Sequence, residues 1–175
     1  KGKPSATSVG NVPATLQVKD ATSTVEQSFS IYVNVRPVLT SLTISTEEDH
    51  AVTFPAGLFN SGYTDANENQ MVSIQVTTIP VSGTLSVAGV GVKVGDTIAV
   101  TSLSQLVYTP NPDFSGTDFF GWNASDGYHS SLTPARVDIS VLPVNDPPEI
   151  VFHQDTLLYE VNGEPAFLAP LIDIV

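Results

Sequence analysis

The side chains in this chain that could do chemistry are mostly carboxylates. The 175 residues include 18 Asp and Glu against 6 Lys and Arg, so the formal net charge is -12. Such a chain repels nucleic acids and anionic membranes, and cations are its natural partners. The stretch VLPVNDPPE places the pair Asn145 and Asp146 before two prolines. Either this pair holds something, or the prolines make the stretch a stiff, extended spacer.

Catalytic arrangements are not indicated by the sequence. His50, His129 and His153 fall in three different predicted segments, and the chain has no cysteine. No Gly-x-Ser-x-Gly elbow, phosphate-binding loop or His-Glu-x-x-His motif occurs in the sequence. Pairs of carboxylates occur, but glycoside hydrolysis needs two of them in a cleft with tuned pKa values. We therefore predict that the chain is not an enzyme.

Apolar residues alternate with polar ones along most of the chain, which is typical of half-buried strands. No stretch keeps helical spacing for three turns, and Gly, Pro, Asn and Asp turns recur about every ten residues. This pattern predicts an all-β, antiparallel Greek-key β-sandwich of the cadherin or immunoglobulin type. The alternating positions are Phe29, Ile31, Val33 and Val35; Val72, Ile74 and Val76; Leu85 and Val87; Val90, Val92 and Val94; Ile98 and Val100; and Ala135, Val137, Ile139 and Val141.

Two places combine the end of an alternating strand with proline and a new start. These are Arg36-Pro37 and Pro147-Pro148. The interval between them has the size of one sandwich domain. We expect residues 1–36 to be the closing strands of a preceding domain, 37–146 a complete sandwich, and 147–175 the opening strands of a following one. Neither flank has enough strands to bury a core alone.

The central segment carries several motifs in order, among them STEEDHAVTF, LVYTPNPDFSGTDFFGWNASDG and ARVDISVLPVNDPP. Over about 110 of the 175 residues it resembles one unit of the tandem cadherin-like repeats of very large secreted and cell-surface proteins. The first flank is similar to the end of a dystroglycan-type cadherin-like or immunoglobulin-like domain. The last flank resembles the opening of another cadherin-like unit.

This resemblance implies calcium at domain junctions. Calcium takes six to eight oxygen ligands, so carboxylates and carbonyls must come together from several loops. At the second junction the resemblance assigns Asn145 and Asp146 of the linker. It adds Glu47 or Glu48 of the first strand, and Asp126 as a further contributor.

Departures from the family pattern weaken the implied sites. Pro143 stands where the linker of the family carries an acidic residue, and its Asp-Arg-Glu motif has no counterpart. At the first junction, NVRPVL lacks the Asn-Asp pair and carries Arg36, a cation that repels calcium. In the cadherin family the following domain also adds an Asp-x-Asp motif, which Asp65 and Asn67 match imperfectly. Calcium is therefore expected more at the second junction than at the first.

Structural explanations compete with metal binding at the two acidic stretches. DANENQ is also typical of a polar turn, since Asp and Asn bond to their own backbone. Residues 47–49, EED, also fit the solvated end of an edge strand.

Two features of the FFGWNAS stretch lie on opposite faces of one predicted strand. Phe120, Trp122 and Ala124 share a face and are expected in the core. Asn123 should point outward, and with Ala124 and Ser125 it forms an N-glycosylation triplet that also arises by chance.

Together these features predict a structural or adhesive repeat module of a long extracellular or cell-surface protein, with short linkers and a calcium-stiffened junction. Its partners would be neighbouring domains, other copies in a fibre or array, and glycans or surface proteins. A carbohydrate- or protein-binding adhesion module, with Tyr63 or Tyr128 at its surface, remains an alternative. So does an ancillary sandwich of a multidomain secreted enzyme.

Overall fold

The computed structural model describes residues 8–55, 57–146, 150–152 and 172–174. It forms two units, residues 1–143 and residues 144–175. The second unit contains β14 (Ile150–Phe152) and β15 (Ile172–Ile174), which pair antiparallel. No helix within the described residues has the length and apolarity needed to span a membrane.

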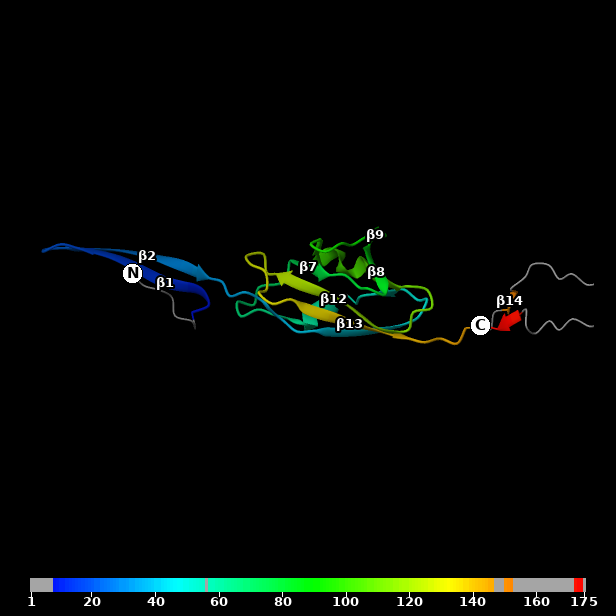
Figure 1. Cartoon of the computed structure of the whole chain (residues 1–175). Helices are drawn as coiled ribbons and strands as arrows, with labels where there is room; N and C mark the ends of the chain where they lie inside the picture. The colour runs from blue at the N-terminus through cyan, green and yellow to red at the C-terminus, as the bar shows by residue number, and fades with distance from the viewer. Residues whose placement is uncertain (1–7, 56, 147–149, 153–171, 175) are drawn as a thin grey trace, which may run out of the picture. The chain divides into compact units, whose positions relative to one another are not determined.

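The first unit contains a long hairpin and a sandwich (Figure 1). The hairpin consists of β1 (Gly10–Lys19) and β2 (Thr24–Val33), which pair over their full length. The remaining elements are β3 (Val38–Leu39), β4 (Leu42–Glu47), β5 (Val52–Thr53), α1 (Leu58–Ser61), β6 (Tyr63–Thr64), β7 (Ser73–Thr78), β8 (Gly83–Val87), β9 (Val90–Gly91), β10 (Thr97–Ala99), η1 (Val100–Gln105), β11 (Leu106–Pro110), β12 (Gly116–Ser125) and β13 (Ala135–Leu142).

Two sheets make up the sandwich, which confirms the predicted all-β fold. One sheet has the strand order β10-β7-β12-β13-β4, and the other has the order β5-β11-β8-β9. The pairing is antiparallel, as predicted, except at one edge, where β4 pairs parallel with β13. The first and last strands of this sheet must run in the same direction if the chain enters the sandwich at one end and leaves it at the other.

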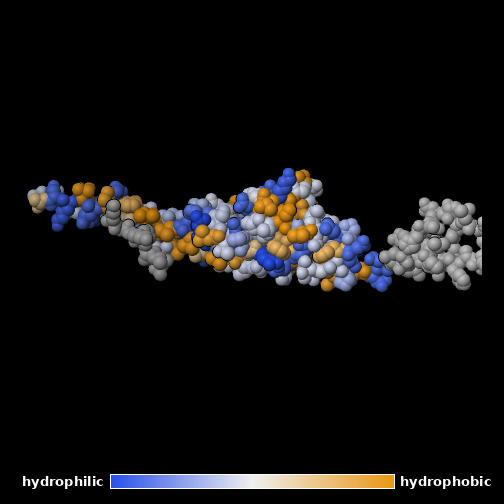
Figure 2. Space-filling view, viewed as in Figure 1, coloured by the Kyte–Doolittle hydropathy of each residue, from blue (hydrophilic) through white to orange (hydrophobic). Residues whose placement is uncertain are grey.

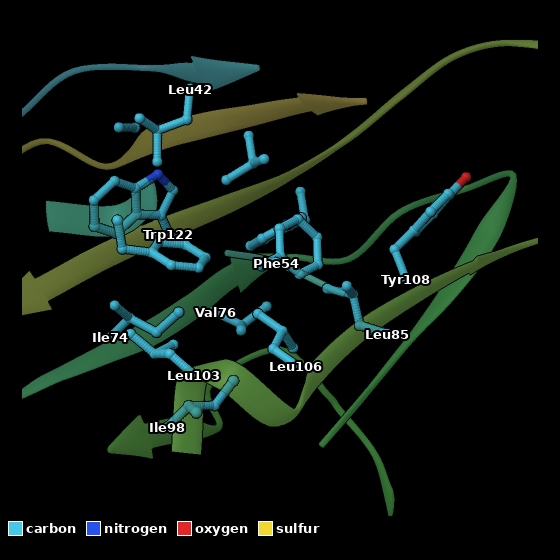
Figure 3. Close-up of a cluster of buried hydrophobic side chains, with 14 of the residues drawn as sticks. Leu42, Phe54, Ile74, Val76, Leu85, Ile98, Leu103, Leu106, Tyr108 and Trp122 are labelled. Atoms are coloured by element: carbon cyan, nitrogen blue, oxygen red, sulfur yellow. The ribbon is translucent and has the colours of Figure 1, made fainter. Parts of the chain in front are cut away.

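The core lies between the two sheets (Figure 3). Phe120, Trp122 and Ala124 project into it from β12 and are at most 1% exposed, as predicted. Phe54 meets Phe120 edge-on at 5.4 Å between ring centroids, and Phe59 meets Trp122 edge-on at 5.2 Å. Such pairs add to the apolar area that the sheets remove from water.

The predicted burial fails at two positions of the stretch GVGVKVGD, whereas Val92 between them is partly buried against the core. Val90 is 72% exposed and Val94 is 59% exposed. Val90 lies on the two-residue edge strand β9, and Val94 lies in a turn closed by Lys93 and Asp96. Alternation continues through this stretch, but the sheet ends there and offers no layer to cover these two side chains.

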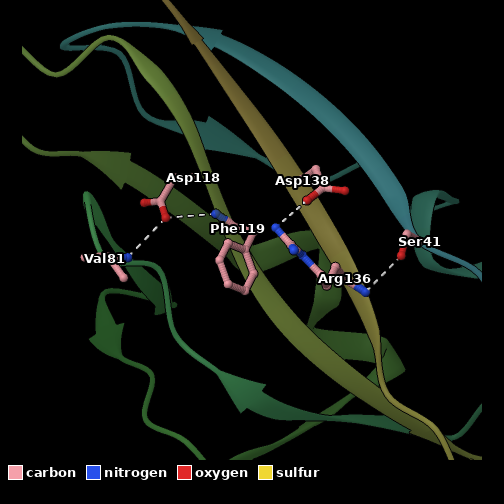
Figure 4. A network of polar contacts seen from close by, with 6 residues as sticks. All are labelled: Ser41, Val81, Asp118, Phe119, Arg136 and Asp138. Atoms are coloured by element: carbon pink, nitrogen blue, oxygen red, sulfur yellow. Dashed lines mark hydrogen bonds and ion pairs between the residues drawn. The ribbon is translucent and has the colours of Figure 1, made fainter.

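A buried carboxylate joins the β7–β8 turn to β12 (Figure 4). Asp118 is 5% exposed. It accepts the N–H groups of Val81 and Ser82 at 3.1 and 2.9 Å, and the Tyr108 hydroxyl at 3.0 Å. Burial, together with the hydrogen bond and charge of Asp118, raises the pKa of Tyr108. Asp118 therefore satisfies three donors from other segments.

We expect Asp118→Ala to lower the free energy of unfolding by about 3–5 kcal/mol, because three donors lose their acceptor in a buried site. Urea unfolding measures this loss. Asp138→Ala is the matched control on the neighbouring strand. Asp138 pairs with Arg136 at 2.9 Å on the exposed face, and its removal should cost less than about 1 kcal/mol. Equal losses in the two variants would contradict the assigned role of Asp118.

Candidate functional site

The candidate metal-binding residues of the first unit lie at two opposite ends of the five-stranded sheet. We call them the entry end, where β4 and β13 begin, and the exit end, where both finish. β12 runs the other way, so its last residue, Ser125, lies at the entry end. Ten residues of strand span about 30 Å. Asp126 is therefore separated from Glu47 and Glu48, and its predicted grouping with them at the second junction is corrected.

The entry end is built around the side chain of Asn34, which follows β2. Its Nδ2 donates to Asp126 Oδ2 at 2.7 Å and lies 3.1 Å from Nδ1 of His129. Its Oδ1 accepts a hydrogen bond from Asn69 Nδ2 at 2.8 Å. One amide thus connects the end of the hairpin with two loops of the sandwich. We call these contacts the Asn34 latch.

Asn67 extends the same connection through the backbone. Its Oδ1 accepts the N–H of Val35 at 2.7 Å, and its Nδ2 donates to the carbonyl of Val33 at 2.9 Å. The side-chain amide of Asn67 therefore bonds to the backbone N–H and C=O of this segment in the way that the backbone of a neighbouring strand would. Its amide oxygen, which we predicted as a metal ligand, already accepts a backbone hydrogen bond.

Two long side chains add bonds across the entry end. Tyr32 donates its hydroxyl to Asn69 Oδ1 at 3.1 Å. Arg36 donates to the carbonyl of Ser130 at 2.7 Å. Arg36 was expected to disfavour calcium here. Its guanidinium also ties the linker to the sandwich through this hydrogen bond.

Asp65 forms the polar turn that was the alternative to metal binding. Its Oδ1 accepts the N–H groups of Asn67 and Asn69 at 2.8 and 3.1 Å, and Glu68 takes the left-handed conformation with φ 61°. Its Oδ2 is buried and has no hydrogen-bond partner within the described part of the chain. A metal role for Asp65 and Asn67 stays a prediction.

The charges of Asp65 and Asp126 act on the same phenol. Burial, followed by these two charges, raises the pKa of Tyr63 to about 12. The Asp126 carboxylate itself is buried, which raises its pKa. Hydrogen bonds from the N–H groups of His129 and Tyr128 and from Asn34, with the charge of His129, outweigh burial and lower the pKa overall. Asp126 therefore stays ionised in the latch.

The exit end carries the acidic residues of the EED stretch. Glu47 is exposed and fits a solvated strand end, whereas Glu48 is 5% exposed and does not. The N–H of Glu48 donates to the carbonyl of Leu142 at 2.8 Å, so the ends of β4 and β13 lie side by side.

Asp49 and Asp113 form an acidic pair at the exit end that the sequence did not reveal. Asp49 Oδ1 accepts the N–H of Asp113 at 3.1 Å, and the two side chains bring carboxylate oxygens within 4.8 Å. Both residues adopt positive φ, 58° and 57°. They are 64 positions apart, and no short motif links them.

Asn145 and Asp146 belong to the second unit, where the Asn145 amide donates to the carbonyl of Asp146 at 3.2 Å. The shared calcium site predicted for them with Glu47 or Glu48 stays a prediction. His153 lies outside the described residues.

The remaining candidates differ in exposure. Asn123 is half-buried on β12, and its Oδ1 accepts a hydrogen bond from Ser131 at 3.1 Å. Tyr63 donates to the carbonyl of Asn69 at 3.1 Å within the latch region. Tyr128 is 63% exposed and packs against Tyr32 at 5.3 Å between ring centroids. Of the two tyrosines proposed for surface recognition, Tyr128 is the exposed one.

Residues 34–140 match the family model described as the bacterial Ig domain. This supports an immunoglobulin-like repeat, and neither the cadherin-like nor the dystroglycan-type assignment. No curated protein matches the chain.

Solved structures similar to this chain include the endo-fucoidan hydrolases MfFcnA4 and MfFcnA9 of glycoside hydrolase family 107. They are 18% and 17% identical to it, with TM-scores of 0.37 and 0.36. The alignments cover 82% and 80% of this chain but only 20% and 23% of those chains.

We expect Asn34→Ala to raise the pKa of Asp126 toward its ordinary value, because one of the donors that lower it is lost. Since the folded pKa lies below the unfolded value of about 3.9, the stabilisation from Asp126 is present above that pH and disappears as pH falls through the folded pKa. The stability lost in Asn34→Ala should therefore be greater at pH 7 than at pH 2.

Carboxyl NMR titration of Asp126, with unfolding at both pH values, measures these effects. Asn11→Ala is the control, because Asn11 is an exposed Asn of the hairpin. An Asp126 midpoint that does not move in Asn34→Ala would contradict the assigned contact.

Proposed function

The chain belongs to the bacterial Ig domain family, and on this premise we propose that it is a non-catalytic spacer module that holds neighbouring domains in series. Bacterial Ig-like domains typically occur in surface or extracellular proteins, so we place the module outside the cell. In this role its function is mechanical and depends on how firmly each linker is attached to the sandwich.

The Asn34 latch is the observation that carries this proposal. A flexible linker would leave residues 34–36 bonded only to water. Here, Asn67 pairs with the backbone on both sides of Asn34, and Asn34 itself bonds to Asp126 and Asn69. Several hydrogen bonds that must break together resist bending more than one bond does, and the one to a carboxylate is stronger than a neutral bond.

We expect the double variant Asn34→Ala, Asn67→Ala to release the linker without unfolding the sandwich. The amide of Val35 loses its acceptor, so its hydrogen exchange should accelerate about tenfold or more, equivalent to about 1.4 kcal/mol. Amides of Val137 and Ile139 in β13 should keep their protection. Residual dipolar couplings should show a looser hairpin in the double variant than in Asn11→Ala. Unchanged Val35 exchange would exclude the latch as a stiffening element.

At the exit end we propose that calcium stiffens the second joint. The Asp49–Asp113 pair concentrates negative charge there, beside the end of β13 that leads to Asp146 through the linker. Oxygen donors of this kind suit calcium, whose charge would offset the repulsion between carboxylates. Asp49, Asp113 and Glu47 would contribute from the sandwich, and Asp146 from the linker. Extracellular sites bind at about 0.1–1 mM, so 1 mM calcium would add about 0.4–1.4 kcal/mol.

We expect calcium up to about 10 mM, which exceeds the extracellular affinity range, to raise the melting temperature of the chain. Asp49→Asn combined with Asp113→Asn should remove most of this rise, and so should Asp146→Asn. Asp65→Asn at the entry end and the exposed Asp138→Asn should leave it intact. Isothermal titration calorimetry measures binding directly. A calcium response lost in Asp65→Asn but kept in Asp49→Asn, Asp113→Asn would exclude the proposed site.

A further inference from the structure

The β1–β2 hairpin has one apolar face that no other described element covers. In the register of its ten pairs, Val12 faces Ile31, Ala14 faces Phe29, and Val18 faces Val25. Side chains alternate between faces along a strand, so these residues share one face and the intervening polar residues share the other. Leu16, Val25 and Phe29 are 60, 68 and 48% exposed. Apolar and polar residues alternate along the hairpin in Figure 2.

Its turn has the same hydrogen bonds as the turn after β12. Asp20 Oδ1 accepts the N–H groups of Thr22 and Ser23, and its own N–H donates to the carbonyl of Ser23. Asp126 Oδ1 accepts the N–H groups two and three positions later, and its N–H also donates to the third residue's carbonyl. The two aspartates therefore close their turns with the same pattern of hydrogen bonds.

The pairing around the two turns is also the same. In both turns, the residue just before the aspartate pairs with the residue four positions after the aspartate. Lys19 pairs with Thr24 in the hairpin, and Ser125 pairs with Ser130 in the sandwich. Two positions before the aspartate stand Val18 on the apolar face and Ala124 in the core. Counted from the turn aspartate, the residues on the apolar face of the hairpin therefore hold the same positions as the residues on the inner face of β12 and β13.

In the sandwich, that inner face is covered by side chains of the second sheet, including Leu85, Leu106 and Tyr108. We propose that β1 and β2 are the closing hairpin of a second sandwich of the same type, placed ahead of this one in the polypeptide. The occupant of the apolar face is the inner face of that domain's opposite sheet. β2 leads straight into the Asn34 latch, so the hairpin would transmit the joint's rigidity into that domain.

A second copy of this chain fits the face less well. Two strands of ten residues, each residue rising about 3.3 Å and the strands lying about 4.8 Å apart, present about 300–350 Å². Two such faces would bury about 600–700 Å², whereas stable interfaces bury about 1,200–2,000 Å². The opposite sheet of a sandwich also continues past the hairpin onto further strands, which adds area that a copy of the hairpin lacks.

The test compares residues 1–175 with the parent protein extended by about 100 residues toward its N-terminus, the size of one sandwich. Amide exchange over residues 10–33 should be at least about 100-fold slower in the extended protein, at every protein concentration. Equal exchange in both proteins would overturn the inference. Protection that grows with the concentration of the 1–175 chain would also overturn it, in favour of a second copy.

Matched lysine variants test which face is covered. In the extended protein, Leu16→Lys should lower the melting temperature of the added domain, whereas Thr15→Lys, on the polar face, should not. Equal effects of the two would count against the assigned face.

The inference rests on the proposed role as a module in series. The test measures amide protection of the hairpin, whereas the proposed function is tested by linker stiffness and calcium binding. Failure of the inference can therefore be distinguished from failure of the proposed function.

Discussion

The parallel pairing of β4 with β13 is the constraint on which the rest of the structure depends. It makes the first and last strands of the main sheet run side by side in one direction, from Val137 opposite Leu42 to Leu142 opposite Glu47. A strand spans the length of the sandwich, so the chain must enter at one end and leave at the other. Each end then has its own set of loops. The side chains of those loops supply the polar groups that contact the linker at that end.

The two ends use different polar chemistry. At the entry end, neutral amides satisfy the linker backbone, and the single carboxylate bonded to Asn34 is supplied with hydrogen-bond donors. At the exit end, Asp49 and Asp113 carry like charges close together. Amide bonding makes a joint whose strength does not depend on ions, whereas clustered carboxylates repel one another unless a cation screens them.

The buried polar residues show where a pattern of residues is informative and where it is not. Phe120, Trp122 and Ala124 were assigned to the core because alternation places them on one face of a strand. Asp118 shares that face and is also buried, although its type suggests the surface. Its environment consists of the Val81 and Ser82 amides and the Tyr108 hydroxyl, which come from other parts of the chain.

The amino-acid sequence by itself determined the fold class and most of the strands, because alternation and turn residues act over a few residues. Tertiary structure decided which polar residues meet. Asp126 was assigned to the wrong end because the direction of β12 is set by its pairing with β13, not by its own residues. Asn34 and Asp126 are 92 positions apart, and Asp49 and Asp113 are 64 apart. Contacts at such separations follow from strand order and direction, which depend on the packing of the whole sandwich.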